Sequence, residues 1–146
     1  MFDELKYIEL SGKKYPIKCS LLVLEKIQEA YDSIGIFENG LMTVEPVLDE
    51  TGNRIKDDCG KIQVRGKFPD LKCVNDALYW MLNEGEAIAA EKEHRQADFF
   101  TREKAVRLVD RMIIPLANEL HDELYRCIVP KKQDDSEPEE DDGRAG

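Results

Sequence analysis

The 146-residue sequence predicts an α+β fold, with a mainly helical body of three to four helices, a small N-terminal antiparallel β-hairpin or sheet, and a disordered acidic C-terminal tail. Runs that alternate apolar and polar residues lie at the start of the chain. Three later segments repeat apolar residues at helical spacing. Residues 133–142 contain no Ala, Val, Ile, Leu, Met or aromatic residue that could offset the entropy of ordering. We therefore expect one globular domain over 1–130 and a tail over 131–146.

The first element is a β-hairpin predicted over residues 5–19. Two alternating runs, Leu5–Leu10 and Tyr15–Cys19, flank the polar stretch Ser11–Lys14. Gly12 can supply the positive φ that a tight turn needs, so we expect the turn at this residue.

A helix is predicted over residues 21–34. Ser20 stands where a helix N-cap is expected, and Gly35 stands where a C-terminal stop is expected. The residues between them place one apolar face on a helical wheel, made of Leu21, Val23, Leu24, Ile27, Ala30, Tyr31 and Ile34.

Residues 36–69 are predicted to be irregular or to form a second hairpin. The segment is too long for an ordinary connection in a compact domain. Gly52-Asn53 gives a turn signal, and we expect it at the tip of the hairpin. Pro46 limits the first arm of that hairpin to a sheet edge. Residues 61–65 alternate apolar and polar side chains and are expected to be extended, while no internal repeat is evident along the chain.

Two further helical regions are predicted over 71–95 and 102–128. Asp70 and Thr101 are the expected N-caps. Gly85 weakens the first helix by about 1 kcal/mol relative to alanine, so a kink or break is possible there. Pro115 removes a backbone donor from the second, which predicts either one kinked helix or two helices that meet at this residue.

The charge of the chain argues against nucleic acid as a partner. Residues 131–146 hold seven acidic and three basic residues, a net charge of −4, which leaves −6 of the total −10 for the first 130 residues. Binding to a phosphate backbone needs a basic surface, and no cluster of Lys and Arg with interleaved aromatic residues is present.

Neither a membrane-spanning stretch nor a signal peptide is evident, so a cytosolic protein without a membrane partner is expected. Four scattered cysteines form no C-x-x-C pair, and we expect them to be reduced thiols. These residues are Cys19, Cys59, Cys73 and Cys127.

Catalytic and metal sites have little support in the sequence. Glu91 and His94 have the i, i+3 spacing of di-iron ligands, but such a site needs the motif twice. His121-Asp122 resembles a metal-ligand pair, yet the chain has only two histidines. A catalytic Cys–His pair has no further support, because the sequence contains no glycine-flanked turn of the kind that presents a nucleophile. We therefore expect a protein that is not an enzyme, with no catalytic residue, no metal ligand and no cofactor.

Phe99 and Phe100 are the candidate partner-binding residues. They stand directly before Thr101, the expected N-cap of the last helical region. We expect one of the two rings to pack onto the following helix as a hydrophobic staple. The other ring is then exposed and can contribute to a partner surface.

The first 35 residues carry a family resemblance. The first group of residues that carries it lies within Ile8–Ile17 and consists of Gly12, Lys13, Tyr15 and Pro16. A second group lies at the end of the following predicted helix. That second group is Glu29, Tyr31, Ser33, Ile34 and Gly35. Together they resemble the opening of the tail assembly chaperones of long-tailed bacteriophages and prophages.

This resemblance implies a non-enzymatic chaperone in the host bacterial cytoplasm. Its partners would be the long, helical tape measure protein, which it coats, and the tail tube protein, whose subunits it recruits. Self-association is also possible. Two alternatives remain open at this point, namely a structural phage component such as a head–tail connector or minor tail protein, and a small cytosolic adaptor or regulator.

Overall fold

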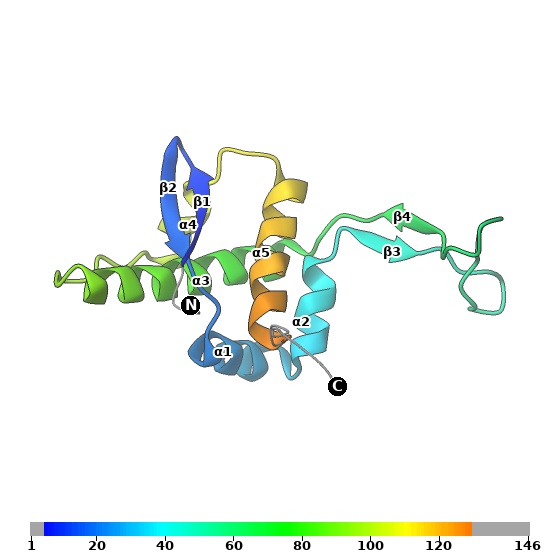
Figure 1. Ribbon diagram of the computed structural model, residues 1–146, viewed down its shortest axis with the longest axis horizontal. Helices are drawn as coiled ribbons and strands as arrows, with labels where there is room; N and C mark the ends of the chain where they lie inside the picture. The colour runs from blue at the N-terminus through cyan, green and yellow to red at the C-terminus, as the bar shows by residue number, and fades with distance from the viewer. Residues whose placement is uncertain (1–4, 130–146) are drawn as a thin grey trace, which may run out of the picture.

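The computed structural model describes residues 5–129, which have the predicted α+β class with helices packed into a body and two small antiparallel strand pairs (Figure 1). In chain order the elements are β1 (Lys6–Leu10), β2 (Lys13–Ile17), α1 (Leu21–Tyr31), α2 (Ile34–Leu41), β3 (Val44–Pro46), β4 (Val64–Gly66), α3 (Leu71–Lys92), α4 (Arg102–Arg107) and α5 (Ile113–Ile128). The tail predicted over 131–146 lies outside the described residues.

β1 and β2 form the N-terminal hairpin that the alternating pattern predicts. Their register pairs Lys6 with Ile17 at the open end. Ser11 and Gly12 have φ angles of 50° and 77°, and two positive values are what a type I′ hairpin turn requires. One face of the hairpin is buried, so the hairpin contributes to the core through Ile8, Leu10 and Ile17.

β2 lies directly against the backbone of α3, and Gly85 makes this possible. A Cβ atom at residue 85 would lie 2.2 Å from the carbonyl oxygen of Pro16 and 2.8 Å from the backbone nitrogen of Ile17. The backbone N–H of Lys18 also donates a 3.1 Å hydrogen bond to the carbonyl oxygen of Met81. α3 continues through Gly85 without a break. The glycine therefore serves the close approach of a strand to a helix.

The single helix predicted over 21–34 is wrong, because the chain forms two helices here. Asp32 has a positive φ of 70° and ends α1. The Ser33 hydroxyl then accepts a 3.0 Å hydrogen bond from the N–H of Ile36 and caps α2. Gly35 lies inside α2 and is not the predicted stop. Burial of an apolar face stabilises this second helix, and that face includes Phe37 and Leu41.

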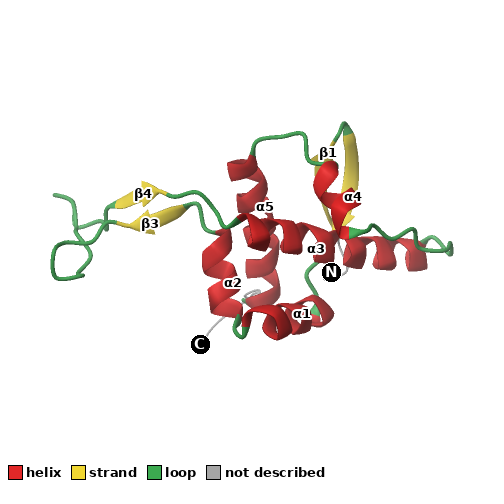
Figure 2. Cartoon of the chain, turned by 180° about the vertical axis from the view of Figure 1, so that it is seen from behind, coloured by secondary structure: helices red, strands yellow, loops and turns green. Residues whose placement is uncertain are grey.

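Residues 42–68 form an arm that projects from the body (Figure 1, Figure 2). At its base β3 pairs with β4, which contains the last two residues of the piece predicted to be extended over 61–65. Farther out, three backbone hydrogen bonds close a triangle: Val47 donates to Gln63, Gln63 donates to Ile55, and Ile55 donates to Val47. Two hairpins and the β3–β4 pair therefore meet at one junction, where the sequence predicted a single hairpin.

The two outer turns of the arm, Asp49–Asn53 and Asp57–Lys61, share one geometry. In each, the leading Asp carboxylate accepts 2.9 Å hydrogen bonds from the N–H groups two and four residues later. The fourth position holds Gly52 or Gly60, with φ of 87° or 82°. The arm thus contains an Asp-x-x-Gly repeat that the sequence analysis missed, although it placed the first turn correctly.

The region predicted as a helix over 102–128 forms two helices, but they do not meet at Pro115. Residues 108–112 separate α4 from α5. Pro115 is the third residue of α5, where the backbone N–H has no partner within the helix, so proline is tolerated. The connection holds the hairpin, since Ser11 donates from its N–H to Asp110 Oδ1 over 2.9 Å and from its hydroxyl to the carbonyl oxygen of Leu108 over 2.7 Å.

α3 runs through the middle of the body, with the hairpin and α1 on opposite sides of it (Figure 1, Figure 2). Side chains from all these elements, together with α2 and α5, form one continuous core. Its large buried members include Val23, Ile27, Phe37, Leu41, Val74, Leu78, Met81, Leu82, Leu116, Leu120 and Leu124.

A buried carboxylate on α3, Asp76, ties α1, α3 and α4 together. Its oxygens accept hydrogen bonds from the Tyr31 hydroxyl over 2.8 Å, from Lys72 Nζ over 3.0 Å and from Arg102 Nε over 2.9 Å. Burial raises the pKa of Asp76, but these three hydrogen bonds outweigh burial and hold that pKa below its ordinary value. Burial and the bond to Asp76 raise the pKa of the Tyr31 hydroxyl.

Replacing Gly85 with alanine tests the contact between β2 and α3. Helix propensity alone favours Gly85→Ala by about 1 kcal/mol. The clash of the new Cβ with the Pro16 backbone outweighs this gain and makes the substitution destabilising. We expect the free energy of unfolding, measured in urea, to fall by about 3 kcal/mol. Gly35→Ala is the matched control, because a Cβ there meets only the Ser33 Oγ at 3.9 Å. A stabilised G85A variant would contradict the packing described.

The Asp76 network makes stability depend on pH in the acid range. Because the folded pKa is lowered, the ionised carboxylate stabilises the fold above its unfolded pKa of about 3.9, and this contribution is lost as the pH falls through the folded pKa. We expect Asp76→Asn to lower the free energy of unfolding by about 1 to 3 kcal/mol at pH 7, with a smaller difference at pH 3. An equal difference at both pH values would exclude an ionised Asp76 as the cause.

Candidate functional site

Phe99 and Phe100, the candidate partner-binding residues, point to different environments. Phe100 is half-buried and packs edge-to-face on Tyr15 of β2, with ring centroids 5.6 Å apart. Lys104 of α4 places its Nζ 5.9 Å from the centroid of the same ring. Phe99 is 58% exposed. Phe100 is thus fixed between the hairpin and α4, and Phe99 is left on the surface.

Asn83 fixes the backbone next to these two rings. Its Nδ2 donates to the carbonyl oxygen of Phe100 over 3.0 Å, and its Oδ1 accepts from the Phe100 N–H over 2.8 Å. An amide side chain can satisfy both backbone groups of one residue in this way. The position of Phe99 is therefore set by α3 through its neighbour.

Glu86 fixes the same loop one helical turn farther along α3. Both carboxylate oxygens accept hydrogen bonds from the Arg95 guanidinium, over 2.6 and 3.2 Å, and Oε2 also accepts from the N–H of Asp98 over 2.8 Å. The Arg95 guanidinium holds the pKa of Glu86 below its ordinary value and outweighs the opposing effect of burial. Glu86 is almost completely buried. Its charged hydrogen bonds therefore hold the residues before Phe99 against α3.

Phe99 lines a groove between α1 and α3, with a volume of about 480 Å³. We call this the α1–α3 groove. Apolar side chains contribute much of its lining: Leu22, Val23, Tyr79, Trp80, Ala87 and Phe99. Leu22 is 61% exposed, and the ring of Trp80 is half-buried. The groove therefore leaves large apolar side chains in contact with water, which is typical of an interaction surface.

The rim of the α1–α3 groove is mainly acidic. Among the described residues its charged side chains are Glu25, Lys26 and Glu29 of α1 and Glu84 of α3. None of the three glutamates forms an ion pair within residues 5–129. The groove thus combines an apolar floor with an excess of negative charge at its rim.

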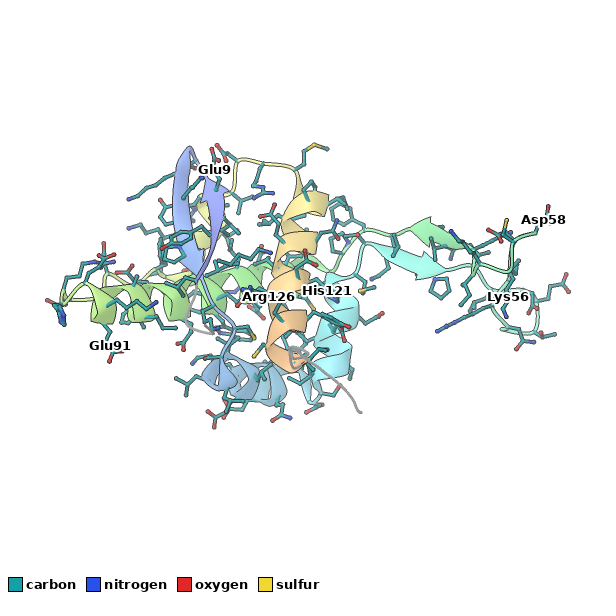
Figure 3. All side chains as sticks on the ribbon, viewed as in Figure 1. Glu9, Lys56, Asp58, Glu91, His121 and Arg126 are labelled. Atoms are coloured by element: carbon teal, nitrogen blue, oxygen red, sulfur yellow. The ribbon has the colours of Figure 1, made fainter. Side chains whose placement is uncertain are left out.

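The two histidine motifs do not come together. Glu91 lies near the far end of α3, whereas His121 lies on α5 within the body (Figure 3). His121 Nε2 is 2.9 Å from Glu38 Oε2 of α2, and its ring stacks on Tyr125, so it joins two helices. Within the described part of the chain, no three His, Cys, Asp or Glu side chains are grouped so that they could hold a metal ion.

None of the four cysteines forms a disulfide in this structure. Burial is the main cause that raises the pKa of Cys19, and the neighbouring Cys127 thiol raises it further. Burial also raises the pKa of Cys73. A protonated, buried thiol is a poor nucleophile, so neither residue has the environment of a catalytic cysteine.

The projecting arm is a second exposed apolar surface, and sequence reasoning did not identify it. Its exposed apolar side chains are Val44, Leu48, Ile62, Val64 and Phe68. Lys56 and Asp58 lie at its tip, far from the body (Figure 3). The sequence shows the alternation of apolar and polar residues in this segment, but only the tertiary arrangement shows that no other element of residues 5–129 covers it.

Comparison with protein-family models, with curated proteins and with solved structures finds no match for this chain. Among residues 5–129, no helix has both the length and the apolar character needed to cross a bilayer.

Asn83→Ala tests how Phe99 is positioned. The variant leaves both backbone groups of Phe100 without their partner, and we expect a loss of about 1 to 2 kcal/mol in the free energy of unfolding. The amide of Phe100 should also exchange faster with solvent, as measured by NMR. Gln28→Ala, at an exposed site on α1, should change stability by less than about 0.5 kcal/mol. Unchanged exchange at Phe100 would show that other contacts fix the loop.

Proposed function

We propose that this protein is a non-enzymatic tail assembly chaperone of a bacteriophage or prophage, which binds the tape measure protein and recruits tail tube subunits in the host bacterial cytoplasm. The resemblance of residues 8–17 and 29–35 supports this proposal. The observation that carries it furthest is the exposed apolar groove beside Phe99, because a protein that works by binding needs such a surface.

The residues of the resemblance have structural roles that make them a unit. Gly12 forms the hairpin turn, Pro16 meets α3 at Gly85, and Tyr15 packs on Phe100. Ser33 caps α2. This unit sets the positions of α1 and of the loop that carries Phe99, so it supports a binding surface without forming that surface itself.

A chaperone for a long client gains from weak, repeated contacts. Several copies along one client bind by avidity, and each copy can still leave as the tail tube grows. We therefore expect single contacts of micromolar affinity or weaker, about 8 kcal/mol or less.

The projecting arm favours a second candidate, a structural component such as a head–tail connector or minor tail protein. Isolated strand pairs with apolar residues on the outside are marginal in water, and burial in an assembled particle would stabilise them. On this reading the arm is covered by neighbouring subunits in the virion.

Purified particles and a binding assay distinguish these two functions. The tape measure protein is expected to be a long helical protein encoded by a gene downstream of this one. We expect the full chain to copurify with a fragment of that protein. We also expect mass spectrometry to find no copy of the chain in purified virions. A fixed copy number in virions would identify a structural component instead. Absence of both tube and tape measure genes beside the gene for this chain would favour the adaptor or regulator.

A further inference from the structure

We propose that the α1–α3 groove binds one amphipathic helix that carries basic residues beside its apolar stripe, supplied by another protein. This inference rests on the proposed function only for the identity of the partner, a helical client protein that supplies the helix. The site itself follows from the apolar floor, the spacing of its residues, the charge of its rim and the fixed position of Phe99.

The spacing of the lining residues suits a helix. On α1 they recur at Leu22, Lys26 and Glu29, and on α3 at Trp80, Glu84 and Ala87. Each set spans about two helical turns, or about 11 Å. A docked helix presents apolar side chains at i, i+4 and i+7 over the same length, so three such side chains can contact the floor together.

The charge of the rim selects among helices. Glu25, Glu29 and Glu84 have no ion-pair partner within the described residues, and Lys26 is the basic side chain beside them. Lys or Arg residues that flank the apolar stripe of a client helix would meet these carboxylates. An acidic helix or an anionic lipid surface would be repelled by the same groups.

The groove is prepared for binding before the partner arrives. Asn83 and Glu86 hold the loop around Phe99 to α3, so little ordering is required on binding. Trp80 and Phe99 are aromatic and partly exposed, and both line the groove. Aromatic residues commonly dominate the affinity of a contact, and we expect these two rings to do so here.

Trp80 provides the readout, because it is the single tryptophan of the chain. The probe is a synthetic helical peptide of about 18 residues without Trp or Tyr, with Leu at i, i+4 and i+7 and Lys on both flanks. Titration into the full chain should change the emission of Trp80 with a micromolar dissociation constant, and rising salt should weaken binding. The same peptide with Glu in place of Lys should bind at least tenfold more weakly.

Two matched variants locate the site. Phe99→Ala should weaken binding of the basic peptide at least tenfold. Phe68→Ala removes a ring of similar exposure from the arm and should leave binding unchanged. Phe68 is 63% exposed and Phe99 is 58% exposed. The double variant Glu25→Lys and Glu29→Lys should reverse the preference, so that the acidic peptide binds better. Circular dichroism checks that each variant keeps its helix content.

The outcomes separate this inference from the proposed function. Equal binding of basic and acidic peptides, or equal loss in the two Phe variants, would overturn the α1–α3 groove as a basic-helix site. Unchanged copurification of the tape measure fragment with the Phe99→Ala variant would overturn it as well, while the chaperone function stands. Peptide binding in the groove without any tape measure complex would leave the site intact and remove the proposed client.

Discussion

The arrangement of this protein depends on a backbone contact between β2 and α3, made where Gly85 has no side chain. The carbonyl of Pro16 occupies the space that a Cβ would fill, so the hairpin sits closer to the helix than side chains would allow. That distance places Ile17 in the core and Tyr15 against Phe100. Phe100 is the neighbour of Phe99, so this contact also bears on the position of Phe99 in the lining of the α1–α3 groove.

Buried carboxylates stabilise the rest of the body around that contact. Asp76 joins α1, α3 and α4, Glu86 holds the loop before α4, and Glu123 of α5 accepts a 2.9 Å hydrogen bond from the backbone N–H of Cys19. Arg126 pairs with Glu123. Asp76 and Glu123 have partners from distant parts of the chain, and Glu86 has partners in the loop that follows α3, so these bonds fix how the elements lie relative to one another. Within residues 5–129, they leave the α1–α3 groove and the arm exposed.

Local patterns were sufficient to predict the hairpin and the apolar faces of α3 and α5, because alternation and helical spacing reflect burial directly. The break at Asp32 was missed, since the apolar spacing continues through Ile34 and only Ser33, as a new N-cap, marks the start of α2. The arm could not be predicted in detail because its junction consists of backbone hydrogen bonds between distant residues. Phe99 was identified as a candidate, whereas the groove beside it combines α1, α3 and a loop, and no sequence spacing connects them.

Hydrogen–deuterium exchange on the full chain, alone and with a tape measure fragment, tests most directly whether the body binds a helical client through the α1–α3 groove. Bound client should slow the exchange of amides in 21–31 and 79–101, where the lining residues lie, and leave 42–68 unchanged. Protection confined to the arm, with no change along α1 and α3, would contradict the account and assign binding to the other exposed apolar surface.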